Sequence, residues 1–330
     1  MTKMTKIERL RAAIEGEQVD RPPVALWRHF PGDDYRPADL AAATLAFQRR
    51  YDFDFVKVTP ASGFCAQDWG ARDQWSGDKL EGTREYTHYP IRSPDDWLKL
   101  CPLDPTEGAL GAQLHCLRLI ADGLEGETPF IQTVFSPLSQ AKNLVGKERL
   151  LVHLRRYPDA VHAGLETIAE TTIRFVASVC EAGTDGIFYA VQHAQYSLLN
   201  EAEYLAFGRS YDLRVLEAAQ RLWLNVLHLH GRDVMFDLLA DYPVQVLNWH
   251  DRETEPRLAE GKRRFGGAVC GGLQRWDVMV RGDPEQVWEQ AADAMAQTGG
   301  RRFILGTGCV TPIVAPTSNI RAVRDAVEKL

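Results

Sequence analysis

Several features that mark particular protein classes are missing from this chain. No apolar run approaches the roughly 20 residues that a helix needs to cross a bilayer. The net charge is −7, and lysine and arginine form no dense block. The six cysteines include no Cys-x-x-Cys pair, and residues 1–17 form a charged helical pattern without an apolar signal core. The sequence therefore predicts a cytoplasmic protein with reduced cysteines and with no membrane or nucleic-acid partner.

The composition is that of an ordinary globular protein, and the length suits an enzyme. Hydrophobic residues make up 45% of the chain and charged residues 25%, close to the average for soluble domains. No tandem repeat and no low-complexity linker divides the 330 residues. We therefore expect a single domain over residues 1–330.

Short apolar runs alternate with helical patterns along the chain. Runs of four to six apolar residues are typical of parallel strands that are covered on both faces. No Gly-x-Gly-x-x-Gly follows the first run, so a (β/α)8 barrel is favoured over a doubly wound open sheet. The predicted strands cover residues 23–27, 54–58, 130–134, 186–191, 225–229, 244–249, 266–270 and 302–305.

The predicted helices follow from amphipathic patterns and their capping signals. Pro158 and Pro284 stand near helix starts, where a missing N–H has no cost. Residues 60–128 are too many for an ordinary loop, so we expect an insertion after the second strand, with a β-like run at 84–91. Besides an N-terminal helix, the clearest helical patterns cover residues 38–50, 158–182, 201–223, 284–297 and 318–329.

Histidines gather where the predicted strands end. In a barrel of this type the reactive side chains come from the carboxyl ends of several strands, which meet on one face. Five of the nine histidines lie at such ends, and a cysteine follows the last strand. These residues are His29, His193, His228, His230, His250 and Cys309.

His228 and His230 are two residues apart, so both imidazoles project from the same side of one strand. With Cys309 they could offer a metal two nitrogens and one sulfur, a set that zinc accepts. The plainer interpretation is that one histidine forms a hydrogen bond within the barrel and Cys309 is a small buried residue. The glycines of 306–309 allow a third interpretation, a phosphate-binding turn.

Other polar residues at the strand ends are candidates for substrate contacts. Arg28 suits a carboxylate, which a guanidinium can bind through two hydrogen bonds, but it is equally compatible with a rim ion pair. Asp251, beside His250, is a candidate acid or base, or part of a solvated loop. Our candidates for substrate binding are Arg28, His29, Gln192 and His193, and those for catalysis are His250 and Asp251.

Three segments resemble the uroporphyrinogen decarboxylase superfamily. Residues 9–28 are similar to its N-terminal helix and first strand, residues 304–323 to its glycine-rich signature after strand eight, and residues 228–231 to a strand-five signature. The resemblance extends over the whole chain. It implies a distorted (β/α)8 barrel, often dimeric, in agreement with the strand pattern.

Within the superfamily, the resemblance to the decarboxylase itself is incomplete. Arg28 is kept, but His29 replaces the family's Gln, and Gly32 falls near its second Arg. Residues 54–64 carry no acid where the decarboxylase has the Asp that holds the pyrrole N–H groups, and Cys309 stands at the position of its His. These differences imply that decarboxylation of uroporphyrinogen is not the main activity.

The zinc methyltransferases of the superfamily give a closer match. They carry His-x-Cys after strand five and a Cys in the last glycine-rich loop, and here the pattern is His228-Leu229-His230 with Cys309. The resemblance implies a Zn²⁺ site and transfer of a methyl group between a corrinoid donor, carried by a partner protein, and a thiol or similar acceptor. His250 is a further candidate ligand.

We therefore expect a metal-dependent methyltransferase that acts on a small-molecule substrate as a homodimer. The first alternative is a carboxy-lyase acting on uroporphyrinogen or a smaller carboxylic acid. The second is a non-catalytic protein that binds a tetrapyrrole or a corrinoid.

Overall fold

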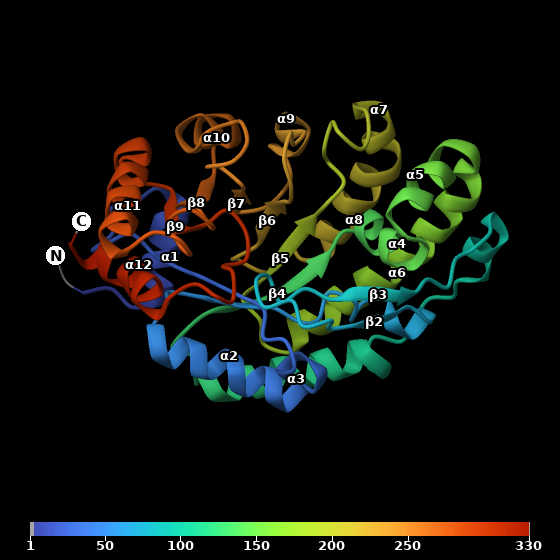
Figure 1. Ribbon diagram of the computed structural model, residues 1–330, viewed down its shortest axis with the longest axis horizontal. Coiled ribbons are helices and arrows are strands. Elements are labelled where there is room, and N and C mark those ends of the chain that lie inside the picture. The colour runs from blue at the N-terminus through green and yellow to red at the C-terminus, as the bar shows by residue number, and fades with distance from the viewer. Residues whose placement is uncertain (1–2, 330) are drawn as a thin grey trace.

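A computed structural model describes residues 3–329, and within them a curled parallel sheet forms the centre of the molecule (Figure 1). The predicted alternation of parallel strands and helices is confirmed. The strands lie in the order β1-β4-β5-β6-β7-β8-β9. Their bounds are β1 Val56–Val58, β4 Phe130–Phe135, β5 Gly186–Val191, β6 Val226–Leu229, β7 Val246–Trp249, β8 Ala268–Leu273 and β9 Phe303–Thr307.

The barrel is closed by a stretch of chain that is not a regular strand, so the predicted strand at 23–27 was too long. Val24 forms one isolated parallel bridge with Leu305. Ala25 N–H donates to Leu305 at 3.0 Å, and Asp54 N–H donates to the carbonyl of Val24 at 2.9 Å. Pro22 and Pro23 have no N–H to offer, which limits a ladder here.

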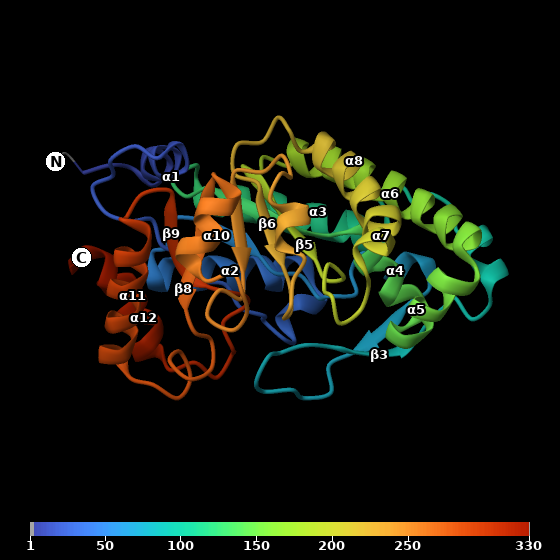
Figure 2. The ribbon, with the colours of Figure 1, turned by 90° about the horizontal axis from the view of Figure 1, so that it is seen from above.

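Helices surround the sheet, and none within residues 3–329 is long and apolar enough to cross a membrane. Figures 1 and 2 show α2 and α3 side by side along one flank, away from α7, α9 and α10. The α-helices are α1 Lys6–Glu15, α2 Pro37–Tyr51, α3 Gly108–Leu124, α4 Pro137–Val145, α5 Lys147–Arg156, α6 Pro158–Glu181, α7 Glu201–Tyr204, α8 Ser210–Ala218, α9 Phe236–Leu239, α10 Leu258–Phe265, α11 Pro284–Thr298 and α12 Thr317–Lys329.

The helix predicted over 201–223 is interrupted and shorter. A π-helical segment, Leu205–Arg209, separates α7 from α8, and α8 ends at Ala218. The ring of Tyr204 packs so closely on Gly208 that a Cβ there would lie 2.5 Å from it. The irregular turn accommodates this contact, which the sequence pattern did not reveal.

The predicted insertion, which follows β1, is confirmed, and it contains a small antiparallel pair of strands. β2 (Arg72–Gln74) pairs with β3 (Glu85–His88), so the β-like run at 84–91 is confirmed. Short 3-10 helices lie at Asp33–Tyr35, Gln67–Trp69 and Pro94–Lys99. The loop between β2 and β3 is held to the loops after β8 and β9, because Arg275 contacts Glu81 at 2.5 Å and Ile313 N–H donates to the carbonyl of Leu80 at 2.8 Å.

Two apolar clusters hold the layers together. A large one lies between the sheet and the helices, and a smaller one fills the lumen with residues that include Trp27, Phe55, Phe188 and Val226. Strand side chains alternate between the two faces. The residues two positions further toward the carboxyl ends therefore also face the lumen, and Lys57, His228 and Asn248 among them are polar. The apolar core of the lumen ends at this level, and the candidate site begins.

A buried cluster of charges fixes the opposite end of the barrel. Asp54 is completely buried and accepts hydrogen bonds from Arg9 of α1 and from Arg21, each at 2.7 Å. It also accepts the N–H of Val24 at 2.8 Å. One carboxylate thus joins α1, the closing segment and the approach to β1.

Replacing Asp54 by Ala should lower the free energy of unfolding by about 3–5 kcal/mol, because Arg9 and Arg21 would lose the fully buried carboxylate that they share. Arg9 would keep only Asp20, and Arg21 only the more exposed Glu328. Urea denaturation measures this change. The matched control is Asp241→Ala, which removes a carboxylate that is 68% exposed in its pair with Arg209 and should cost less than about 1 kcal/mol. Equal losses in the two variants would contradict this role of Asp54.

Candidate metal centre

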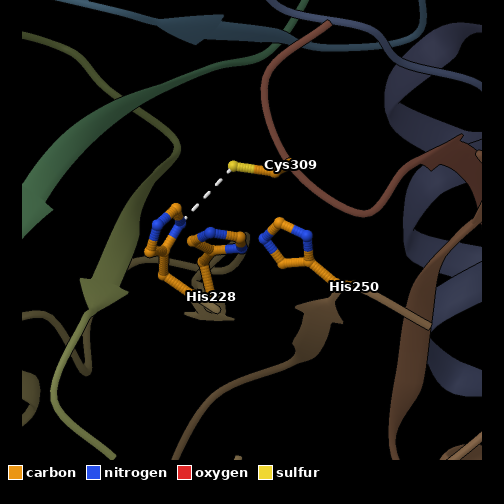
Figure 3. Close-up of side chains that lie close together, drawn as sticks. His228, His250 and Cys309 are labelled. Carbon is orange, nitrogen blue, oxygen red and sulfur yellow. Dashed lines mark hydrogen bonds between the residues drawn. The ribbon is translucent and has the colours of Figure 1, made fainter. Parts of the chain in front are cut away.

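Four of the predicted site residues meet at the carboxyl ends of β6, β7 and β9. His228 belongs to β6, His230 and His250 follow β6 and β7, and Cys309 lies two residues after β9. Each offers one nitrogen or sulfur atom, and these four atoms lie within 4.8 Å of one another. Figure 3 shows His228, His250 and Cys309 directed toward a common point.

His228 is held in one orientation by Asn248 on the neighbouring strand. Its Nδ1 lies 2.7 Å from Oδ1 of Asn248, and the Asn248 amide donates to the carbonyls of Cys270 at 2.8 Å and Thr307 at 3.1 Å. Because the amide N–H groups are used in this way, Oδ1 must accept and Nδ1 of His228 must carry the proton. The lone pair of Nε2 is therefore free for a ligand.

The surroundings of His228 favour its neutral form. The side chain is buried, its ring stacks on Phe188 with centroids 5.1 Å apart, and burial lowers its pKa. Nε2 has no hydrogen-bond partner among the described residues. A buried imidazole with one nitrogen anchored and the other unsatisfied is the arrangement expected of a metal ligand.

Cys309 is the only sulfur in the cluster. Its Sγ lies 3.7 Å from Nδ1 of His230. Burial alone would raise the pKa of the thiol, but the neighbouring imidazoles of His228, His230 and His250 outweigh burial and hold it well below its usual value. The environment therefore stabilises a thiolate, the form that binds metals.

His250 completes the group and is buried without a hydrogen bond to either ring nitrogen in the described residues. Nδ1 lies 3.6 Å from the Glu253 carboxylate. Burial acts to lower the pKa of His250, but Cys309 and Glu253 outweigh it and raise the pKa to about 9.

The donor set fits a zinc ion. Zinc binds imidazole nitrogen and thiolate sulfur in tetrahedral sites, and three histidines with one cysteine provide both. The three unsatisfied ring nitrogens of His228 and His250 are costly when buried without a partner. A bound metal would satisfy those that face the centre.

The residues predicted to contact substrate fall into two groups. Arg28 lies over the rings of Phe30 and Phe47, and Nη1 approaches the carbonyl of Ile313 at 3.4 Å. Burial lowers the pKa of His29 to about 4, helped by the nearby positive charge of Lys57. Gln192 and His193 instead line a cavity of about 370 Å³ that reaches His230.

Asp251 lies next to His250 in the chain but faces a different direction. Its buried carboxylate accepts the N–H of Gly272 at 3.1 and 3.2 Å, and burial raises its pKa to about 6. It is not one of the four clustered residues. The carboxylate therefore contacts the backbone of β8.

The glycine-rich turn does not have the form of a phosphate site. β9 ends at Thr307 and α12 begins at Thr317, so no helix N-terminus adjoins the glycines at 306 and 308. Thr307 Oγ1 instead donates to the Cys309 carbonyl at 2.6 Å, and the turn serves to present the cysteine.

The sequence analysis missed three polar residues around the site, of which Asn248 and Lys57 are buried and Lys142 is partly buried. Asn248 lies in an apolar strand run, Lys57 lies in another, and Lys142 belongs to α4. A lone polar residue within an apolar run is a signal that could have identified the first two. Lys142 is one charge among many on helices, and nothing in its local sequence distinguishes it.

Sequence comparison relates the whole chain to known enzymes. The family model described as "Uroporphyrinogen decarboxylase (URO-D)" matches residues 5–330. The methylcobamide:CoM methyltransferase MtbA of Methanosarcina mazei is 23% identical, covering 97% of each chain. The uroporphyrinogen decarboxylase of Proteus mirabilis is 24% identical over 76% of this chain and 71% of its own.

Comparison of structures agrees on the fold. A methyltransferase from Methanosarcina mazei superimposes with a TM-score of 0.87 at 18% identity, covering 99% of each chain. A B12-independent methionine synthase from Shewanella sp. W3-18-1 gives a TM-score of 0.60 at 12% identity. The relatives include methyltransferases and decarboxylases, so the chain is related to enzymes. From the match over residues 5–330, this chain belongs to the uroporphyrinogen decarboxylase family.

Proposed function

We propose that this protein is a zinc-dependent methyltransferase that passes a methyl group from a corrinoid donor to a thiol or a similar acceptor. The observation that carries the proposal is the group of His228, His230, His250 and Cys309, whose donor atoms lie within 4.8 Å of one another. The relationship to methylcobamide:CoM methyltransferases over nearly the whole chain supports the reaction class.

His228, His230 and Cys309 would hold the ion and leave one position to the acceptor, with His250 as a further donor when no acceptor is bound. When bound, zinc would act as a Lewis acid that lowers the pKa of an acceptor thiol and keeps it as a nucleophilic thiolate. Two neutral imidazoles and one thiolate place less negative charge on the ion than one imidazole and two thiolates do. This leaves the ion more electrophilic.

Residues around the centre orient its ligands and exclude water from them. Asn248 fixes the ring of His228 so that Nε2 faces the cluster. Phe188 covers one face of that ring, and the burial of His228, His250 and Cys309 keeps bulk water away from them. In such a site charges interact more strongly than they do in water.

Substrate contacts are proposed for the polar residues around the cluster. Gln192 and His193 are proposed to contact the acceptor, because they line the cavity that reaches His230. Arg28 and His29 follow the closing segment on the other side of the barrel and are proposed to contact the donor side. A separate corrinoid-carrying protein would bring the methyl group.

Purified protein should contain about one zinc per chain, and Cys309→Ser should lose most of it, because a neutral hydroxyl replaces the thiolate ligand. Elemental analysis of protein made without chelator or histidine tag measures both. The matched control is Cys101→Ser, which changes an exposed cysteine and should keep the metal.

Methyl transfer from methylcobalamin to a thiol should follow the zinc content of these variants. Retained metal in Cys309→Ser would contradict the assigned ligand set. Release of carbon dioxide from uroporphyrinogen, with no methyl transfer, would favour the carboxy-lyase instead.

Asn248→Ala should weaken zinc binding by about 10- to 100-fold, because His228 loses the partner that sets its tautomer and orientation. Competition with a chromophoric chelator measures the affinity. Asn225→Ala serves as a control. Asn225 is a buried residue just before β6, the strand of His228, and its side chain bonds only to backbone groups, at Ile187, Ala219 and Leu222. Both variants should be less stable, and only Asn248→Ala should bind zinc more weakly.

A further inference from the structure

A cavity of about 370 Å³ adjoins the metal centre, and two lysines are among the residues that line it. His230 belongs to both, since it is one of the four clustered residues and also part of the cavity wall. A molecule in the cavity can therefore contact both His230 and the lysines.

The cavity wall is positively charged. Lys142, from α4, and Lys147, at the start of α5, both line it, and no Asp or Glu is among the lining residues. Lys142 is partly buried, and its Nζ donates to Oε1 of Gln192 at 2.7 Å, which uses one of the three N–H groups of the ammonium. The lining residues therefore include two ammonium groups and no carboxylate that would balance their charge.

His193 adds a second incomplete group to the same wall. Its side chain is 3% exposed, and Nδ1 has no hydrogen-bond partner among the described residues. Burial, with the positive charge of Lys142, lowers the pKa of His193 to about 3. The ring is therefore neutral near pH 7, and the unpartnered nitrogen remains available to a ligand as donor or acceptor.

The amine of Lys142 keeps its charge despite its position. Burial lowers the pKa of Lys142 to about 8, so most of the amine is protonated at pH 7. A bound anion would be stabilised by hydrogen bonds from a charged donor, which are about twice as strong as neutral ones.

We propose that Lys142 and Lys147, with Gln192 and His193, form an anion-binding subsite that selects an acceptor carrying a carboxylate, or an anion of similar size, away from its reacting atom. The proposal rests on the proposed function, because it assumes that the reacting atom of the acceptor sits at the metal beside His230. It assigns to α4 and α5 the choice of acceptor, separate from the chemistry.

Two probes of nearly identical shape test the subsite. 3-Mercaptopropionate carries the anion, and 3-mercaptopropionamide replaces it by a neutral amide. Calorimetric titration of zinc-loaded protein should show that the acid binds at least about tenfold more tightly, as expected for a hydrogen bond to a charged group. 3-Mercaptopropane-1-sulfonate, titrated in parallel, distinguishes a sulfonate preference from a carboxylate preference.

Lys142→Gln and Lys147→Gln should each reduce the preference for the acid and leave the affinity for the amide within about twofold. Lys147 is exposed, so its variant should fold even if Lys142→Gln does not. Lys99→Gln is the matched control, because Lys99 is an exposed lysine paired with Asp96, remote from the cavity lining, and it should keep the full preference.

The subsite and the proposed function can fail separately. Equal affinity of the acid and the amide in zinc-loaded protein, or a preference that survives both lysine substitutions, would overturn the subsite and leave the metal centre intact. If the protein holds no zinc, the same titrations are made on metal-free protein. A preference for the acid that both lysine variants lose would still support the subsite, and no preference would overturn it.

Discussion

The hydrogen bond between His228 and Asn248 organises the candidate centre. Oδ1 of Asn248 faces His228 as an acceptor because the amide N–H groups of Asn248 donate to the carbonyls of Cys270 in β8 and Thr307 in β9. The bond therefore depends on the register of four parallel strands, β6 to β9, and a shift of one residue would turn Asn248 out of the lumen. The same register brings Cys309 and His250 to the free nitrogen of His228. In this way the correct pairing of the sheet fixes the chemistry of one imidazole.

Much of this architecture could be predicted from the sequence. The apolar runs at 130–134 and 186–191 identified β4 and β5 almost to the residue, because strands buried on both faces have continuous apolar sequences. The strand ends also brought His228, His230 and Cys309 together in advance, since the carboxyl ends of parallel strands share one face. The closing segment at 23–27 has a similar apolar sequence, yet it forms only one isolated bridge, between Val24 and Leu305. Pairing of this kind depends on distant residues, which local sequence does not describe.

The polar groups around the centre were harder to predict for a related reason. Asn248 and Lys57 are single polar residues in strands, and their role depends on which face of the strand each one occupies. Lys142 and Lys147 lie on helices α4 and α5, far in sequence from His230, and only the fold brings them into the wall of the same cavity as His230. Asp251, by contrast, was close in sequence to the site and yet contacts the backbone of β8.

Because the barrel is closed only by the bridge at Val24, the arrangement of the ligands also bears on the stability of the barrel. A wall that is joined by one bridge has a seam, and local opening in proteins begins where few backbone hydrogen bonds must break. β9 forms one side of this seam, and Cys309 follows β9, whereas His228 and His230 lie three strands away. An ion held by these residues would link the end of β9, at the seam, to the end of β6 on the other side of the lumen. This link would close a loop of chain between residues 230 and 309 and restrict its motion. Metal binding would then stabilise the barrel against opening at the seam, in addition to its role in the reaction.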